Sequence, residues 1–250
     1  MSGSARRIRL EPAFLLHHYP WRDSSRILEL LTRSHGRLSV FARAARRSGS
    51  GLAAALQPFA ELLVSFSLRG EAGQLTGVEQ GLSAAAQVPA SQLMSAYYAN
   101  ELLLRLLPKG DPHPRLYTAY AELVAMLAAP HANPAGALRI FEKRLLDELG
   151  YGLNLRTETS TGRPVEAQHS YRYRVDSGPE LVNGVAEGSL VFCGSSLLAL
   201  ATETLDDARS VADARRLLRA ALEQILDGRE LRTRQVALAM RALGRDAGAG

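Results

Sequence analysis

Short runs of alternating apolar and polar positions fill residues 12–82, and this period of two is typical of β-strands. The clearest run is RLSVFARA at residues 37–44, where Leu38, Val40 and Ala42 face one way and the intervening residues face the other. Five such strands, with a long basic connection after the third, predict a small barrel. An OB-fold is the first candidate, although a five-stranded SH3-like barrel would have a similar pattern.

From about Ser91 the period changes to that of helices. The expected helices cover residues 92–107, 115–128, 134–149, 210–226 and 233–243, with helical periodicity resuming near Ser195. Asn133 and Pro134 fit the start of the third helix and Gly150 its end, while Thr233 fits the cap of the last helix. Residues 151–192 are less regular and predict loops with a short hairpin.

These patterns predict an α+β protein. An N-terminal five-stranded OB-fold barrel spans residues 1–83, and a mainly α-helical domain spans residues 84–250. Residues 151–195 form an irregular loop and hairpin region inside the helical domain, and residues 245–250 form a disordered tail.

Composition is that of a globular chain, with 46% hydrophobic and 22% charged residues. The one cysteine, Cys193, can form neither an internal disulfide nor a zinc site with several thiolates. No signal peptide and no membrane-spanning run are visible in the sequence. We therefore expect a cytoplasmic protein without membrane contact.

No motif indicates catalysis. The sequence has no P-loop and no nucleophile elbow, and its six histidines form no pair of metal ligands at helical spacing. We expect no catalytic residue, no metal site and no cofactor, and interpret the chain as a binding protein and not an enzyme.

Positive charge is concentrated at one end. Residues 1–50 contain ten arginines and three acidic residues, a net charge of +7, whereas the whole chain carries +5. Such asymmetry points to a polyanion, most often a nucleic acid, although a solvated basic face without a ligand has the same composition.

The segment GRLSVFARAARRSGSG, residues 36–51, is the candidate nucleic-acid site. Single-strand binding needs cations for phosphates and flat apolar surfaces for bases. Arginines at four positions are the candidates for phosphates, and Phe41 is the candidate for bases, unless it belongs to the core. The four arginines are Arg37, Arg43, Arg46 and Arg47.

Several segments, in order along the chain, resemble the RecO family of bacterial DNA-repair proteins. AFLLHHYPWRDSS, GRLSVFARAARR and LQPFAELLVSF resemble its amino-terminal OB-fold. YYANELLLRLL, ALRIFEKRLLDELGYGLNL and GRELRTRQV resemble its helical domain. The resemblance implies binding of single- and double-stranded DNA, strand annealing, binding to the tail of the single-stranded-DNA-binding protein, and cooperation with RecR in loading RecA. It also implies association with the nucleoid.

One departure from the family concerns zinc. Many members carry a four-cysteine zinc site after the Gly-Tyr-Gly helix end, but the corresponding stretch LNLRTETSTGRPVE contains no cysteine. Residues 151–195 are thus expected to be a degenerate zinc-ribbon-like region that packing and hydrogen bonds hold together.

The helix at residues 134–149 is the candidate partner site. Arg139, Lys143 and Arg144 flank a stripe that contains Phe141, and an apolar groove with a basic rim suits an acidic peptide with a hydrophobic end. On this hypothesis, Arg139→Ala weakens tail-peptide binding about tenfold and leaves thermal stability unchanged. Ordinary core packing is the competing interpretation. The alternative peptide site is formed by Arg215, Arg216 and Arg219.

Two other functions fit the same composition. An RNA-binding OB-fold protein acting on tRNA or the ribosome would have similar cations and aromatic residues, because DNA and RNA both present phosphates and stackable bases. A hydrolase with an unrecognised site is the third hypothesis, which a nuclease assay with and without divalent metal tests.

Overall fold

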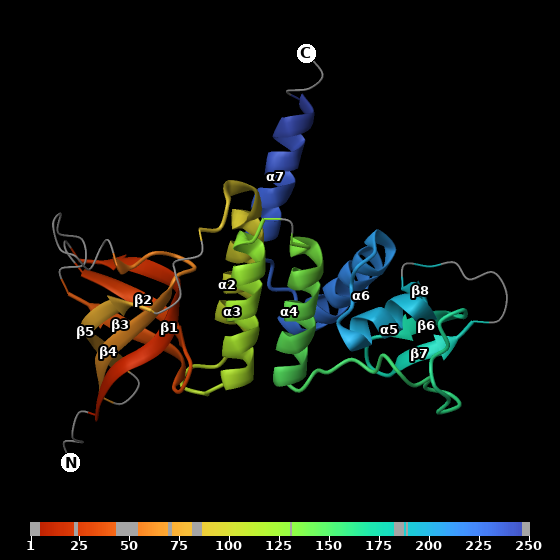
Figure 1. Cartoon of the computed structure of the whole chain (residues 1–250), viewed down its shortest axis with the longest axis horizontal. Helices are drawn as coiled ribbons and strands as arrows, with labels where there is room; N and C mark the ends of the chain where they lie inside the picture. The colour runs from red at the N-terminus through yellow and green to blue at the C-terminus, as the bar shows by residue number, and fades with distance from the viewer. Residues whose placement is uncertain are drawn as a thin grey trace. The chain divides into compact units, whose positions relative to one another are not determined.

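A computed structural model of the chain describes residues 6–22, 25–43, 55–69, 72–81, 87–130, 132–182, 188 and 190–246 (Figure 1). The chain forms two compact units. The first consists of Met1–Pro130 with Leu231–Gly250, and the second is His131–Glu230. The boundary predicted at residue 83 falls inside the first unit and stays a prediction.

The predicted five-stranded barrel is confirmed. It consists of β1 (Arg6–Trp21), β2 (Ser25–Thr32), β3 (Gly36–Ala42), β4 (Glu61–Arg69) and β5 (Ala72–Gln80), closed in the order β1-β2-β3-β5-β4. Strand β1 is long enough to pair with both β2 and β4, and register shifts at two places bend it around the barrel. A short parallel pairing between β3 and β5 completes the closure.

The alternation predicted for residues 37–42 is also confirmed, because Leu38, Val40 and Ala42 are buried while the residues between them are half-exposed. Inward-facing residues from the other strands join them in one core inside the barrel, among them Leu28, Leu62 and Phe66. Alternation thus sorts each strand into a core side and an outer side.

Helices α2 (Leu93–Leu106), α3 (Pro114–Ala128) and α7 (Arg232–Asp246) complete the first unit, with a single 3-10 turn, η1 (Ala90–Gln92), before α2. The predicted cap at Thr233 is wrong, because α7 already begins at Arg232. The carboxylate of Glu101 on α2 instead accepts hydrogen bonds from the backbone nitrogens of Arg232 and Thr233, at 2.8 and 2.9 Å. α7 also extends to Asp246, so it includes residues that were expected to be disordered.

The second unit contains α4 (Pro134–Glu148), β6 (Ser170–Arg174), β7 (Gly178–Leu181), β8 (Val191–Cys193), α5 (Gly194–Thr202) and α6 (Ala208–Leu226). Asn133 caps α4 as predicted, by accepting a hydrogen bond from the nitrogen of Gly136 at 2.9 Å. The expected hairpin is β6–β7, and β8 adds an unpredicted third strand on the other side of β6. Within the described residues, no helix combines the length and the apolar character needed to cross a bilayer.

Close packing joins the β2–β3 turn to the segment that follows α2. Gly36 has a φ of +68°, and a Cβ atom there would lie 2.1 Å from the carbonyl oxygen of Asp111. Gly110 donates its backbone N–H to the carbonyl oxygen of Arg37 at 2.9 Å. Only glycine satisfies both the backbone conformation and the space at position 36.

We predict that Gly36→Ala lowers the free energy of unfolding by about 3 kcal/mol, because a left-handed conformation and a backbone clash add together. Gly110→Ala is the matched control, since Gly110 has a φ of +75° but no atom within 4 Å of an added Cβ. The control should lose only about 1 kcal/mol. Urea denaturation measures both values, and equal losses would contradict the packing argument.

Candidate nucleic-acid interface

The outer side of the barrel carries a row of apolar side chains across three strands. The register pairs Tyr19 of β1 with Ile27 of β2, and Ile27 with Phe41 of β3. Residues directly opposite each other in antiparallel strands point to the same face, so these three form one outward row. Tyr19 is 47% exposed, and Ile27 and Phe41 are half-buried. Phe41 is therefore outside the barrel core, as an interface residue would have to be.

Arg37 does not join this row. Its Nη1 lies 3.0 Å from Oε2 of Glu29, and its Nε donates to the carbonyl oxygen of Leu107 at 3.0 Å. Its side chain is only 14% exposed. Arg37 was predicted to share a surface with Phe41 and Arg43, but its donors are used inside the protein at the opposite end of β3.

Arg43 follows β3 directly, is exposed, and lies two residues after Phe41. Arg46 and Arg47 lie outside the described residues. Of the predicted nucleic-acid residues that the structure describes, Phe41 and Arg43 therefore lie at one end of β3, and Arg37 lies at the other.

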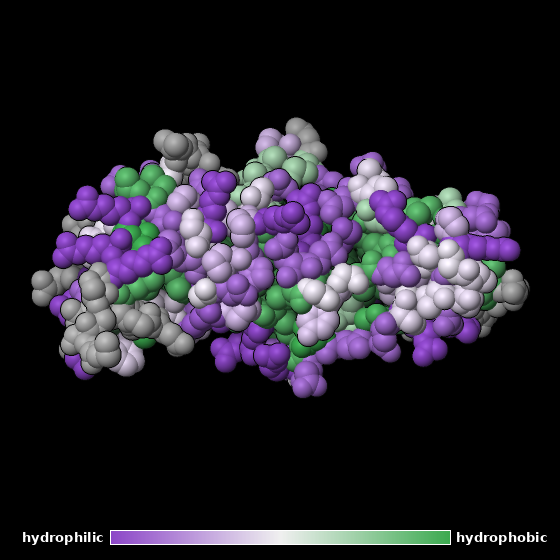
Figure 2. All heavy atoms as spheres, turned by 90° about the horizontal axis from the view of Figure 1, so that it is seen from below, coloured by the Kyte–Doolittle hydropathy of each residue, from purple (hydrophilic) through white to green (hydrophobic). Residues whose placement is uncertain are grey.

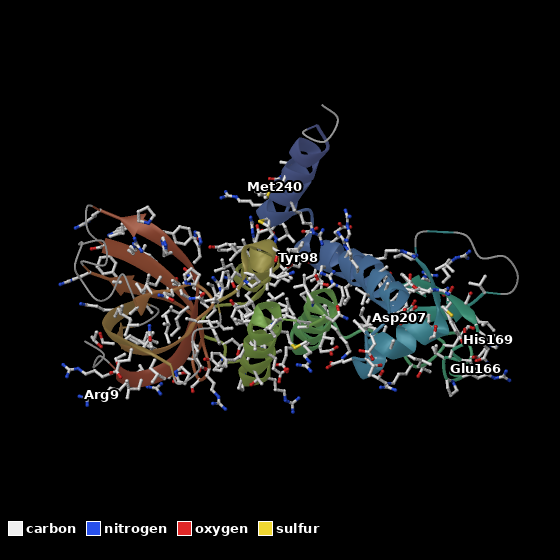
Figure 3. All side chains as sticks on the ribbon, turned by 45° about the horizontal axis from the view of Figure 1, so that its top comes forward. Arg9, Tyr98, Glu166, His169, Asp207 and Met240 are labelled. Carbon is white, nitrogen blue, oxygen red and sulfur yellow. The ribbon has the colours of Figure 1, made fainter. Side chains whose placement is uncertain are left out.

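Positive charge accompanies the barrel. The first unit contains 18 Lys and Arg against 10 Asp and Glu, a net charge of +8, whereas the second unit has a net charge of −3. Arg9 on β1 extends away from the barrel into solvent (Figure 3). On the face drawn in Figure 2, long hydrophilic side chains of the barrel lie beside small hydrophobic patches. The unit that contains the outward row is thus the one suited to a polyanion.

Sequence reasoning missed the aromatic residues of β1. Trp21 is 45% exposed and lies two residues after Tyr19, on the same side of the strand. His17 precedes Tyr19 on that side, with its ring 4.6 Å from the tyrosine ring in an edge arrangement. The signal was present in the sequence, because positions 17, 19 and 21 alternate at the period of a strand.

The predicted partner site on α4 has a different character from the one expected. Phe141 is 1% exposed and belongs to the core. Arg139 is itself buried, and its Nη1 lies 2.9 Å from Oε2 of the fully buried Glu142. These two residues are therefore buried, as the competing interpretation of the stripe as ordinary core packing expects.

The other two cations on α4 are also engaged. Nζ of Lys143 lies 2.9 Å from Asp147 and 3.1 Å from Glu203, and Arg144 lies 2.7 Å from the same Glu203. Burial lowers the pKa of Lys143, but the hydrogen bonds to Asp147 and Glu203 outweigh it and raise that pKa above its ordinary value. These pairs join α4 to the end of α5, where Glu203 adopts a φ of +60°.

Hydrogen bonds organise residues 151–195, the region that was expected to be held together without zinc. Glu158, which is 4% exposed, accepts bonds from the backbone nitrogens and hydroxyls of Ser160 and Thr161. Its own nitrogen donates to the carbonyl oxygen of Arg163 at 2.8 Å. Across the described residues, no three His, Cys, Asp or Glu side chains gather as metal ligands.

In outline, the chain is an OB-type barrel joined to a helical part that includes a small three-stranded sheet. Family models described as "Recombination protein O N terminal" and "Recombination protein O C terminal" match residues 8–82 and 90–235. The chain is 41% identical to the DNA repair protein RecO of Methylococcus capsulatus, over 94% of this chain and 95% of that protein. It is 42% identical to RecO of Alkalilimnicola ehrlichii, over 94% and 92%, and 39% identical to RecO of Coxiella burnetii, over 92% and 98%. The chain belongs to the RecO family of DNA repair and recombination proteins.

We predict that the Glu158 turn makes stability depend on pH in the acid range. Hydrogen bonds from Ser160 and Thr161 lower the pKa of Glu158 from 4.5 to about 2. Because the folded state favours the carboxylate, this stabilisation is complete above pH 4.5 and is lost as the pH falls toward about 2. Glu158→Gln should therefore melt below the wild type at neutral pH, with a difference that shrinks as the pH falls through this range.

Glu166→Gln, which removes a charge from an exposed position in the same region, is the control for the general effect of charge. Thermal melts of the three proteins at a series of pH values measure the effect. A constant difference between wild type and Glu158→Gln down to pH 2 would contradict the prediction.

The structure changes the stability expected of Arg139→Ala. Removing the guanidinium takes a partner from the buried Glu142 carboxylate, so we predict a loss of about 3 kcal/mol instead of none. Arg219→Ala is the control, since Arg219 and Glu223 form an exposed pair on α6 and such a pair contributes at most about 1 kcal/mol. Denaturant melts compare the two variants. If Arg139→Ala is as stable as the control, Arg139 is available for a partner.

Proposed function

We propose that this chain is a non-enzymatic mediator of DNA repair and homologous recombination. It binds single- and double-stranded DNA through the barrel and anneals complementary strands. Together with RecR, it helps to load RecA on DNA that is coated with single-stranded-DNA-binding protein. Membership of the RecO family supports the general role in repair and recombination.

The observation that carries DNA binding is the outward row of Tyr19, Ile27 and Phe41 beside exposed Arg43, in the unit with a net charge of +8. Apolar rings and neighbouring cations are what proteins use to hold unpaired bases and phosphates. Annealing follows from the same chemistry, because a basic surface that holds one strand lowers the repulsion that a complementary strand meets.

For the acidic tail of the single-stranded-DNA-binding protein, we propose a site in the second unit. The engagement of Arg139 and Phe141 in the core shifts the best candidates to α6. There Arg215 is exposed, whereas Arg216 pairs with Asp213 at 3.0 Å and Arg219 pairs with Glu223 at 2.8 Å, so Arg215 is the first candidate. A tail-peptide titration with Arg215→Ala, beside Arg139→Ala, tests this choice.

Matched DNA and RNA strands titrated by fluorescence anisotropy, together with a strand-annealing assay, test the proposal. DNA binding with annealing is the expected result. Tight binding of RNA with weak binding of DNA would favour the RNA-binding alternative. Strand cleavage that depends on divalent metal would favour a hydrolase.

We predict that replacing Arg43, Arg46 and Arg47 by alanine weakens DNA binding without changing sequence preference. When a phosphate contact is lost, its counterions stay on the DNA and are not released on binding. The slope of log affinity against log salt should therefore flatten by about 2–3 in total. Anisotropy titrations at several salt concentrations give the slope. Arg174→Ala is the internal contrast, because Arg174 lies in an exposed pair with Glu180 in the second unit and should leave the slope unchanged. An unchanged slope in the triple variant would show that these arginines only keep the surface soluble.

A further inference from the structure

Two large aromatic side chains are exposed on the same side of β1, the first strand of the barrel. Tyr19 and Trp21 lie two residues apart with an unbroken register, and they are 47% and 45% exposed. Single exposed apolar residues are common, but here the exposure is continuous with Ile27 and Phe41 across two further strands. This arrangement is a surface and not an isolated side chain.

We propose that Tyr19 and Trp21 form a stacking platform for unpaired bases and thereby give the barrel a preference for single-stranded over duplex DNA. The inference rests on the proposed DNA binding, and it names unpaired bases as the part of the DNA that these rings bind. In a duplex the faces of the bases are already stacked on one another, so only unpaired bases can offer a face to a protein ring.

The geometry of β1 suits this role. Alternate residues on a strand are about 6.6 Å apart, and stacked bases repeat at about 3.4 Å, so each of the two rings can hold its own base. The ring of His17 packs edge-on against Tyr19 at 4.6 Å and an interplanar angle of 76°, which limits the orientations of the tyrosine before any ligand arrives. Restricting a ring in advance reduces the entropy lost on binding.

The charges of the surroundings are compatible with an incoming phosphate backbone. Arg43 is exposed at the end of β3, two residues after Phe41 and therefore on the same side of the strand. The carboxylate of Glu29, two rows further along the sheet, is engaged by Arg37 and Lys109. The rings of β1 therefore supply contact with bases, while Arg43 beside them supplies contact with phosphates.

Trp21 is the only tryptophan of the chain, so intrinsic tryptophan fluorescence reports on this platform alone. The experiment titrates the full chain with oligothymidine of about 16 nucleotides, the upper end of the length that one OB-fold covers. A matched duplex is titrated in parallel, and anisotropy of labelled DNA measures binding independently. We expect oligothymidine to quench Trp21 as binding saturates, and the duplex to bind with much less quenching.

Variants separate stacking from charge. Tyr19→Ala and Trp21→Ala should each weaken oligothymidine binding about tenfold, while Trp21→Phe, which keeps a ring, should retain most of the affinity. None of the three should change the salt slope, because a neutral ring releases no counterions. Tyr151→Ala is the matched control, since Tyr151 is 55% exposed in the second unit and should bind as wild type.

Three outcomes would overturn the proposal. In the first, anisotropy shows DNA binding, but Trp21 fluorescence does not change and both alanine variants bind like the wild type. The stacking platform would then be wrong, while DNA binding would stand. If the alanine variants weaken single-strand and duplex binding equally, the platform does not select unpaired bases. If no DNA binds at all, the proposed function fails and the platform fails with it. Thermal melts of each variant confirm that loss of binding is not loss of folding.

Discussion

The buried carboxylate of Glu29 is the interaction on which the arrangement of the barrel depends. It lies on the outer side of β2 and is 5% exposed, and it is engaged by Arg37, by Lys109 and by the hydroxyl of Ser39. A buried carboxylate costs several kcal/mol unless partners compensate it, so the cluster forms as a whole or not at all. Because Lys109 follows α2 in the chain, this cluster fixes one end of the β2–β3 pair against the helical segment. The other end, with Ile27 and Phe41, stays open as a surface.

Patterns that act between near neighbours in the chain predicted most of the fold. Alternation in residues 37–42 gave the two sides of β3, and Asn133 with Pro134 gave the start of α4, because strand periodicity and helix capping are local effects. The start of α7 could not be predicted in this way. Its cap is the carboxylate of Glu101, which lies about 130 positions earlier and carries no sign of that role in the sequence.

Local periodicity predicted part of the candidate site, but it could not predict the part that depends on contacts between distant residues. Alternation predicts that Phe41 lies on the outer side of β3. It does not predict that Arg37 donates hydrogen bonds to Leu107 and Glu29, because only folding brings these residues together. On α4, helical spacing puts Arg139 beside an apolar stripe whether it faces solvent or pairs with Glu142. A cation next to an apolar stripe therefore does not by itself indicate a binding surface. Tyr19 and Trp21 needed only the periodicity of β1, extended beyond Leu15, its last residue in the barrel core, to the end of the strand.

The two units use their cations differently, and this difference supports the barrel as the site of the proposed DNA binding. In the second unit, cations on α4 and α6 pair with carboxylates of the same unit, as Lys143 does with Asp147 and Arg219 with Glu223. A phosphate that approached them would have to displace these carboxylates, which offsets most of the electrostatic gain. The first unit has eight more cations than acids, so its charge is not neutralised internally. A polyanion gains most where protein charge is unbalanced and flat rings are exposed beside it, and on this chain both conditions meet at the β1–β3 side of the barrel.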